Sequence, residues 1–179
     1  SHRVIKETTA FLLTNAMEDV LTKGTGKKAY FEGTALAGKT GTTTSARDTW
    51  FAGYSPYYTC TVWGGYDDNT VLKDTSYSKL IWKEIMSNLH EDLPGRDFEE
   101  PEGIVQVKVC KKSGLLPISK VCKRASDEKM IIKEYFAEGT SPTSVCDHHM
   151  KVMLCSDTDM LASRLCPDSY SRIVIIDGT

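Results

Sequence analysis

The chain has 179 residues, of which 40% are hydrophobic, and a formal net charge of −2 at pH 7. This length suits one ordinary domain, and the composition is sufficient for a hydrophobic core. The near-neutral charge, with no dense run of Lys and Arg, argues against nucleic-acid binding. No apolar run approaches the ~20 residues that span a bilayer.

The N-terminal half predicts a helix and three strands. Over residues 4–21, apolar side chains recur at three- and four-residue steps, which predicts an amphipathic helix ended by the following Gly24. Residues 33–43, 48–55 and 58–66 predict three consecutive strands. Because their connections are short, we expect them to be antiparallel neighbours in one sheet.

A second amphipathic helix is predicted after the strands, and it can return over the same sheet. Its apolar positions follow the helical period. They are Leu80, Ile81, Trp82, Ile85, Met86 and Leu89.

The C-terminal half changes in character. Residues 91–103 are acidic and rich in Pro and Gly, which predicts a linker. Residues 104–109 alternate strictly between apolar and polar side chains and predict a half-buried strand. After turn-rich sequence, residues 173–176 predict a final strand.

A Lys-Thr-Gly triplet lies on the first predicted strand, at residues 39–41, between small residues. Such a triplet arises by chance in roughly a few per cent of chains of this length, so its context decides its meaning. The next strands carry Arg47-Asp48-x-Trp50-Phe51-x-Gly53-Tyr54 and Val62-Trp63-x-Gly65-Tyr66-Asp67. In penicillin-interacting serine enzymes, Lys-Thr-Gly is the third of three motifs, after Ser-x-x-Lys and Ser-x-Asn.

With these signatures, the chain resembles the C-terminal half of the transpeptidase domain of a bifunctional (class A) penicillin-binding protein. Residues 101–105, 113–117 and 134–143 are similar to the C-terminal extension of that family. Serine β-lactamases share Lys-Thr-Gly, but the tryptophan signatures and the long tail are more similar to the biosynthetic enzymes.

The resemblance implies an α/β (α+β) fold, in which an antiparallel sheet is flanked by helices. Residues 1–90 would form part of a transpeptidase domain like that of penicillin-binding proteins and serine β-lactamases. Residues 91–103 would be the linker, and residues 104–179 a small, β-rich, Cys-containing extension.

The resemblance also implies roles for four residues. Lys39 would supply positive charge near the nucleophile and the substrate carboxylate, and the hydroxyls of Thr40 and Thr42 would bind that carboxylate. The backbone N–H of Thr42 would be an oxyanion donor. Gly41 would leave the strand bare, so that a peptide or β-lactam can lie along it as an added strand. Lys39 and Thr42 are therefore the predicted catalytic residues, and all four are predicted to bind substrate.

No nucleophile is predicted in this chain. The family places Ser-x-x-Lys and Ser-x-Asn before Lys39, and the first 38 residues contain neither. Two later Ser-x-x-Lys strings begin at Ser76 and Ser126, in the wrong order. Ser76 is better interpreted as a helix N-cap whose hydroxyl accepts a backbone N–H, and Ser126 lies in a charged loop. We expect a C-terminal portion of a longer enzyme, inactive by itself.

For the parent enzyme, the resemblance implies peptidoglycan stem peptides and β-lactams as ligands and no cofactor. The N-terminal remainder of the same enzyme would be its partner. That remainder would anchor the enzyme at the extracytoplasmic face of the bacterial membrane. The alternative is a non-catalytic module, in which the strands are scaffold and the Cys-rich tail binds cell-wall polymer or another protein.

Six cysteines, five of them in the last 70 residues, suggest disulfides that staple a small exported extension. Sequence leaves all 15 pairings open. We expect one loop between Cys110 and Cys122 and another among Cys146, Cys155 and Cys166, with Cys60 a free thiol in the core.

A zinc site would take Cys146 with His148 and His149, and Cys155 as a further ligand. No Cys-x-x-Cys and no histidine pair at metal-binding spacing occurs, so we expect no metal and interpret His148-His149 as an exposed polar pair. Trp50, Trp63 and Trp82 are interpreted as core and helix-to-sheet packing residues rather than as a set that stacks on a ligand.

Overall fold

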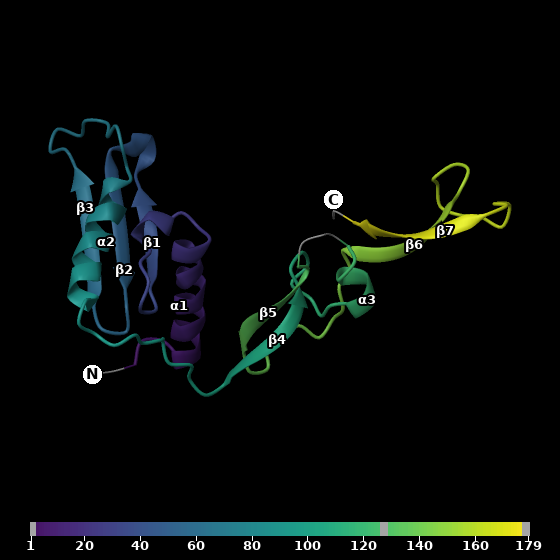
Figure 1. The fold of residues 1–179 in the computed structure, drawn as a ribbon, viewed down its shortest axis with the longest axis horizontal. Helices are drawn as coiled ribbons and strands as arrows, with labels where there is room; N and C mark the ends of the chain where they lie inside the picture. Colours follow the sequence, from purple (N-terminus) through teal and green to yellow (C-terminus); the bar gives the residue numbers. More distant parts are fainter. Residues whose placement is uncertain (1–2, 126–128, 177–179) are drawn as a thin grey trace. The chain divides into compact units, whose positions relative to one another are not determined.

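The computed structural model describes residues 3–125 and 129–176. It divides into two compact units, Ser1–Glu102 and Gly103–Thr179 (Figure 1). Within the described residues, no helix combines the length and the apolar character that a bilayer span requires.

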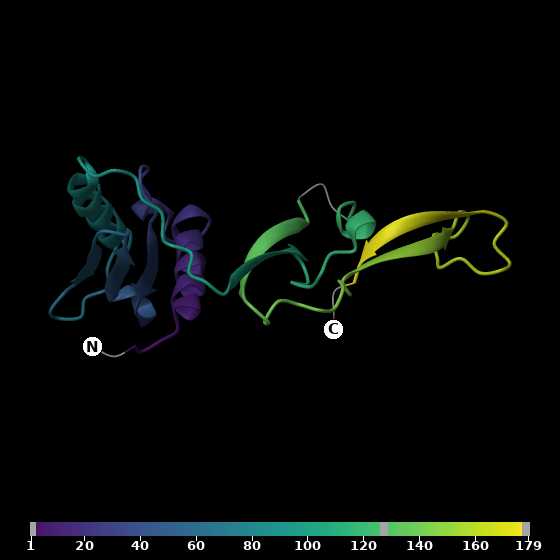
Figure 2. The same ribbon diagram turned by 90° about the horizontal axis from the view of Figure 1, so that it is seen from below.

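The first unit is an antiparallel sheet of three strands in the order β1–β2–β3, flanked by helices, as the sequence predicts. Helix α1 runs beside β1, and α2 packs against β2 and β3 (Figures 1 and 2). The elements are α1 Glu7–Thr22, η1 Lys27–Ala29, β1 Ala37–Thr42, η2 Thr44–Ala46, β2 Asp48–Tyr54, β3 Thr59–Gly65 and α2 Tyr77–His90.

The first strand begins at Ala37 rather than at residue 33. Gly33 has a φ of +107°, a conformation that interrupts a strand. The next residues hydrogen-bond to the segment after α2 instead of to a strand. The Thr34 hydroxyl and the Ala35 N–H both donate to the carbonyl of Arg96, at 3.0 and 2.9 Å.

An aromatic contact forms the centre of the first unit. Phe51 on β2 and Trp82 on α2 are fully buried, and their ring centroids lie 5.0 Å apart in an edge-on arrangement. A Cβ on Gly53 would lie 2.8 Å from the Trp82 ring, so this position needs glycine. The Trp82 indole N–H donates to the Cys60 carbonyl at 3.0 Å. The prediction of a packing role for Trp82 is thus confirmed, and Cys60 is a free thiol that is half-buried and packs against this core.

Residues 91–102, most of the segment predicted to be a linker, belong to the first unit. The Tyr57 hydroxyl donates to the Pro94 carbonyl at 2.9 Å, and the Phe98 ring packs edge-on against Tyr54 at 5.5 Å.

The second unit consists of two hairpins and a short helix. Strand β4 (Ile104–Cys110) pairs with β5 (Ile131–Ala137), and β6 (His149–Cys155) pairs with β7 (Ser169–Ile175). The short helix α3 spans Ser119–Cys122. The two predicted strands of this half lie within β4 and at the end of β7, whereas β5 and β6 were missed.

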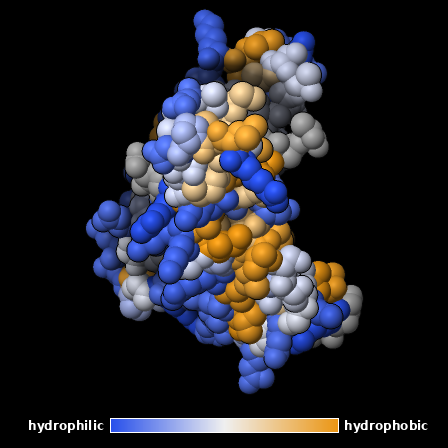
Figure 3. Space-filling view, turned by 90° about the vertical axis from the view of Figure 1, so that its right-hand side faces the viewer, coloured by the Kyte–Doolittle hydropathy of each residue, from blue (hydrophilic) through white to orange (hydrophobic). Residues whose placement is uncertain are grey.

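The second unit buries few apolar side chains. The buried cluster among its described residues consists of three cysteines, against which Ile131 packs. Apolar side chains are instead exposed on the second hairpin, and orange residues interrupt the hydrophilic surface in Figure 3. The most exposed of them are Met160, Leu161 and Leu165, at 70%, 72% and 93%.

Candidate functional site

Strand β1 carries the Lys-Thr-Gly triplet and lies at the edge of the sheet. In the described part of the chain, its one strand neighbour is β2. The Thr43 N–H donates to the Asp48 carbonyl at 3.2 Å, which fixes the alternation of hydrogen bonds along the ladder. Odd-numbered residues of β1 therefore bond to β2, whereas Thr40 and Thr42 direct their backbone N–H and C=O groups to the outer edge.

Lys39 is exposed, and its charge is available to a ligand. Among the described residues, its ammonium donates to the carbonyl of Thr40 at 3.0 Å and meets no carboxylate. A cation without a counter-charge at a strand edge favours an anionic ligand there.

The two threonine side chains lie on the opposite face of β1 from Lys39 and Gly41, because successive side chains alternate. The Thr40 hydroxyl lies 3.0 Å from that of Thr25, in the loop after α1, and Thr42 is exposed. A ligand that lies along the edge can therefore contact the lysine from one face and the hydroxyls from the other.

Gly41 is closely approached by Trp50 of the neighbouring strand. A Cβ on Gly41 would lie 3.2 Å from the Trp50 Cβ. The Trp50 ring lies 6.2 Å from that of Trp63, and the two residues are 44% and 48% exposed. The interpretation of both tryptophans as core residues is wrong, because the strand alternation places them on the sheet face opposite to Phe51 and α2.

The turn after β1 is held by Asp48. Its carboxylate accepts hydrogen bonds from the Thr43 hydroxyl at 3.0 Å and from the Trp63 indole N–H at 3.1 Å. Its backbone N–H donates to the Thr43 hydroxyl at 2.8 Å. Beside it, the Arg47 guanidinium donates to the carbonyl of Asn69. These contacts hold the start of β2 in register with the end of β1.

Ser76 does not have the surroundings of a nucleophile. It is the N-cap residue of α2, but its hydroxyl makes no cap hydrogen bond and donates instead to the Asp74 carboxylate at 2.8 Å, which corrects our interpretation. The ammonium of Lys79 is directed to the Thr75 carbonyl, at 3.4 Å. Ser126 lies outside the described residues.

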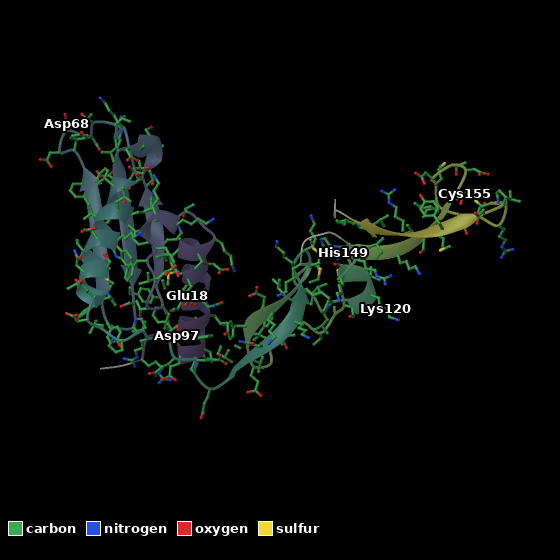
Figure 4. The ribbon with its side chains drawn as sticks, viewed as in Figure 1. Glu18, Asp68, Asp97, Lys120, His149 and Cys155 are labelled. Carbon is green, nitrogen blue, oxygen red and sulfur yellow. The ribbon has the colours of Figure 1, made fainter. Side chains whose placement is uncertain are left out.

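A pocket of about 510 Å³ opens between α1 and the segment before Phe98. Glu18 and Asp97 both line it (Figure 4). Burial raises the pKa of the Glu18 carboxyl above its usual value, and the charge of Asp97 adds to this effect. No residue of the Lys-Thr-Gly triplet lines the pocket, so it is separate from the edge of β1.

The cysteines are placed differently from the predicted pairing, and all six are free thiols. Cys110 and Cys122 lie together as expected, but in one cluster with Cys146 and His149. His149 is 2% exposed, so the interpretation of the histidines as an exposed pair is wrong for this residue.

The other two members of the zinc set considered from the sequence lie outside the cluster. His148 is directed to Asp147, at 2.7 Å. Cys155 lies at the other end of β6, and a hydrogen bond with Cys166 lowers the pKa of its thiol. The signal that could have found the cluster is the Cys-x-x-His spacing of residues 146–149.

Two family models match the chain. Residues 1–89 match the penicillin binding protein transpeptidase domain, and residues 100–151 match the penicillin-binding protein 1A C-terminal domain.

Comparison with individual proteins also finds penicillin-binding proteins. The chain is 40% identical over 159 residues to penicillin-binding protein 1A of Clostridium tetani, covering 83% of this chain and 19% of that protein. It is 33% identical over 149 residues to the protein of that name from Clostridium perfringens, covering 82% and 18%. A crystal structure of penicillin-binding protein 1A from Haemophilus influenzae superposes with a TM-score of 0.68 at 29% identity, over 82% of this chain and 22% of that chain. The chain thus spans about a fifth of the length of the curated relatives it matches.

The Asp48 turn gives a testable prediction. In Asp48→Ala, the end of β1 should open more often, because the Thr43 hydroxyl and the Trp63 indole lose a charged acceptor. Each such bond contributes roughly 1.5–3 kcal/mol, so amide exchange at Thr43 should accelerate about tenfold or more. Hydrogen exchange followed by NMR measures this, with the exposed Asp67→Ala as control. Equal exchange in both variants would contradict this role of Asp48.

Proposed function

Because this chain belongs to the penicillin-binding protein family, in which it matches the transpeptidase domain and the 1A C-terminal domain, we propose that it binds the stem peptide in a peptidoglycan DD-transpeptidase. Such an enzyme cross-links stem peptides by serine acyl transfer and is acylated by β-lactams. This chain contributes the strand against which the substrate lies.

The observation that carries this proposal is the outer edge of β1. Antiparallel pairing with β2 leaves the N–H and C=O groups of Thr40 and Thr42 directed outward, beside the Lys39 ammonium, which meets no carboxylate in the part of the chain that the structure describes. An extended peptide can add to such an edge by backbone hydrogen bonds. A peptide that ends in a carboxylate also finds a cation and hydroxyls there.

The same edge supplies the electrostatic part of the reaction. When a serine attacks the peptide carbonyl, negative charge develops on the carbonyl oxygen, and a fixed N–H donor stabilises it. The N–H of Thr42 has the direction this requires, since it is not used in the ladder with β2. Lys39 and the threonine hydroxyls hold the substrate carboxylate and so orient the scissile bond. Lys39 and Thr42 are therefore the proposed catalytic residues, and Lys39 to Thr42 the proposed binding strand.

We infer that the nucleophile comes from a segment outside these 179 residues. The hydroxyl of Ser76 is bound to Asp74, and the Lys79 ammonium is directed elsewhere. The N-terminal remainder of the same enzyme is the proposed partner, and it anchors the enzyme at the extracytoplasmic face of the membrane. Peptidoglycan stem peptides and β-lactams are the proposed ligands.

The chain by itself should form no penicilloyl adduct. Incubation with a fluorescent penicillin should leave the intact mass of the 179-residue chain unchanged, because both Ser-x-x-Lys strings, at Ser76 and Ser126, follow Lys39 instead of preceding it. The measurement is intact-mass spectrometry with peptide mapping. Labelling of Ser76 or Ser126 would overturn the assignment of the nucleophile to another segment.

Lys39→Ala should slow acylation in a whole enzyme. The test protein is penicillin-binding protein 1A of Clostridium tetani, with its matching C-terminal segment replaced by this chain. Loss of a preorganised charge from the site of the developing anion should slow acylation by on the order of 10² or more. Stopped-flow fluorescence with a labelled penicillin measures the rate.

The control for this variant is Lys108→Ala, since Lys108 is also an exposed lysine on a strand but lies on β4. It should acylate at the unsubstituted rate. If Lys39→Ala also acylates at that rate, then Lys39 is a surface residue and the edge of β1 is not the binding strand.

A further inference from the structure

Four potential metal ligands converge in the second unit, at a site that the transpeptidase activity does not use. The ligand atoms of Cys110, Cys122, Cys146 and His149 all lie within 4.8 Å of one another, and all four residues are buried. They come from the end of β4, the end of α3, the segment before β6 and the start of β6. Figure 4 shows His149 beside α3 with sulfur atoms near it.

The distances between the imidazole nitrogen and the two nearest sulfur atoms fit ligands of one ion. Nδ1 of His149 lies 3.3 Å from Sγ of Cys110 and 3.4 Å from Sγ of Cys146. Around tetrahedral zinc, with Zn–S near 2.3 Å and Zn–N near 2.0 Å, a sulfur and a nitrogen ligand are separated by about 3.5 Å.

Backbone hydrogen bonds hold each of the three cysteines independently of the others. After Cys110 the chain turns through Gly114, whose φ is +72°, and the Gly114 N–H donates to the Cys110 carbonyl at 2.8 Å. The Cys122 N–H donates to Ile118 at 2.8 Å, and the Cys146 N–H donates to Leu116 at 2.7 Å. The backbone thus holds three of the four ligands in place by contacts of its own, as a high-affinity site requires.

The imidazole has little other reason to be buried here. Nε2 of His149 has no hydrogen-bond partner among the described residues, although the atom is buried. Nδ1 is directed at the two sulfurs. A buried histidine held by an ordinary polar network would have both nitrogens paired, whereas here Nδ1 is placed to bind a metal among the sulfurs, with the ring proton on Nε2.

The small size of the second unit also favours a stabilising metal ion or disulfide. A unit of fewer than about 80 residues seldom gains enough stability from its apolar core, and commonly adds disulfides or a structural metal. In the described part of this unit, the buried cluster is the three cysteines with Ile131 against them, and Val109, Leu154 and Cys155 are buried as well.

A disulfide accounts for the cluster less well. It would join two of the three cysteines and leave the third thiol and the imidazole buried without a partner. Three thiolates and one imidazole form a complete set of ligands for a tetrahedral Zn²⁺ site, and four protein ligands leave no open position for a substrate. Soft sulfur donors also disfavour Mg²⁺ and Ca²⁺.

We propose that Cys110, Cys122, Cys146 and His149 bind one structural Zn²⁺, which links β4, α3 and β6. The ion would join the two hairpins of the second unit, because Cys110 ends β4 of one hairpin and His149 begins β6 of the other. It has no part in acyl transfer, so this site can be tested separately from the edge of β1.

The test uses the full 179-residue chain, purified under reducing conditions, loaded with Zn²⁺ and dialysed. Elemental analysis should find one zinc per chain. After replacement by Co²⁺, the visible spectrum should show the intense bands of tetrahedral cobalt together with thiolate charge-transfer absorption. Zinc should also slow the alkylation of Cys110, Cys122 and Cys146 relative to the same chain treated with a chelator, whereas the partly exposed Cys166 should react at the same rate in both, as peptide mapping would show.

Matched variants identify the ligands. Cys122→Ser and His149→Ala should each lose the stoichiometric zinc and the tetrahedral spectrum, whereas Cys155→Ser and His148→Ala should retain both. Because a ligand variant could lose metal by unfolding, alkylation protection in the unsubstituted chain is the deciding readout. Alkylation of Cys110, Cys122 and Cys146 at the same rates with and without zinc, in protein kept reduced, would overturn the proposal.

Discussion

The alternation of hydrogen bonds along an antiparallel strand determines what β1 can bind. The bond between the Thr43 N–H and the Asp48 carbonyl fixes its phase, so that Thr40 and Thr42 present their backbone groups at the outer edge. A slip of one residue would turn those groups toward β2 and exchange the faces of Lys39 and the threonines. The substrate edge thus depends on register, and register depends on the turn at Asp48 and on the packing of β2.

The two units meet the need for a core in different ways. In the first unit, Phe51 and Trp82 pack edge-on and hold β2 against α2. Strand β2, fixed in this way, pairs along its edge with β1. The second unit has little apolar core among its described residues, and its buried centre is made of cysteines with His149 beside them. A proposed ion there would act on the stability of the extension, and the proposed chemistry would remain with the first unit.

Local patterns predicted the sheet and helices of the first unit, because the alternation around Phe51 and the helical period around Trp82 lie within single elements. They did not show that Trp50 and Trp63 are exposed, since which face of a sheet is covered depends on the position of α2. The sulfur cluster was missed for a related reason. Its ligands are up to 39 residues apart along the chain, and only the folded hairpins bring them together. The Lys39 motif was recognisable from sequence because its residues are adjacent.

The central claim is that the outer edge of β1 is the strand on which the acyl donor lies. A crystal structure of a whole penicillin-binding protein that carries this segment, acylated by a penicillin, tests it most directly. We expect the penicillin carboxylate within hydrogen-bond distance of Lys39 or of the Thr40 and Thr42 hydroxyls, and the acyl oxygen accepting from the Thr42 N–H. An acyl group bound away from β1, with the outer N–H groups of Thr40 and Thr42 in contact with solvent alone, would contradict the account.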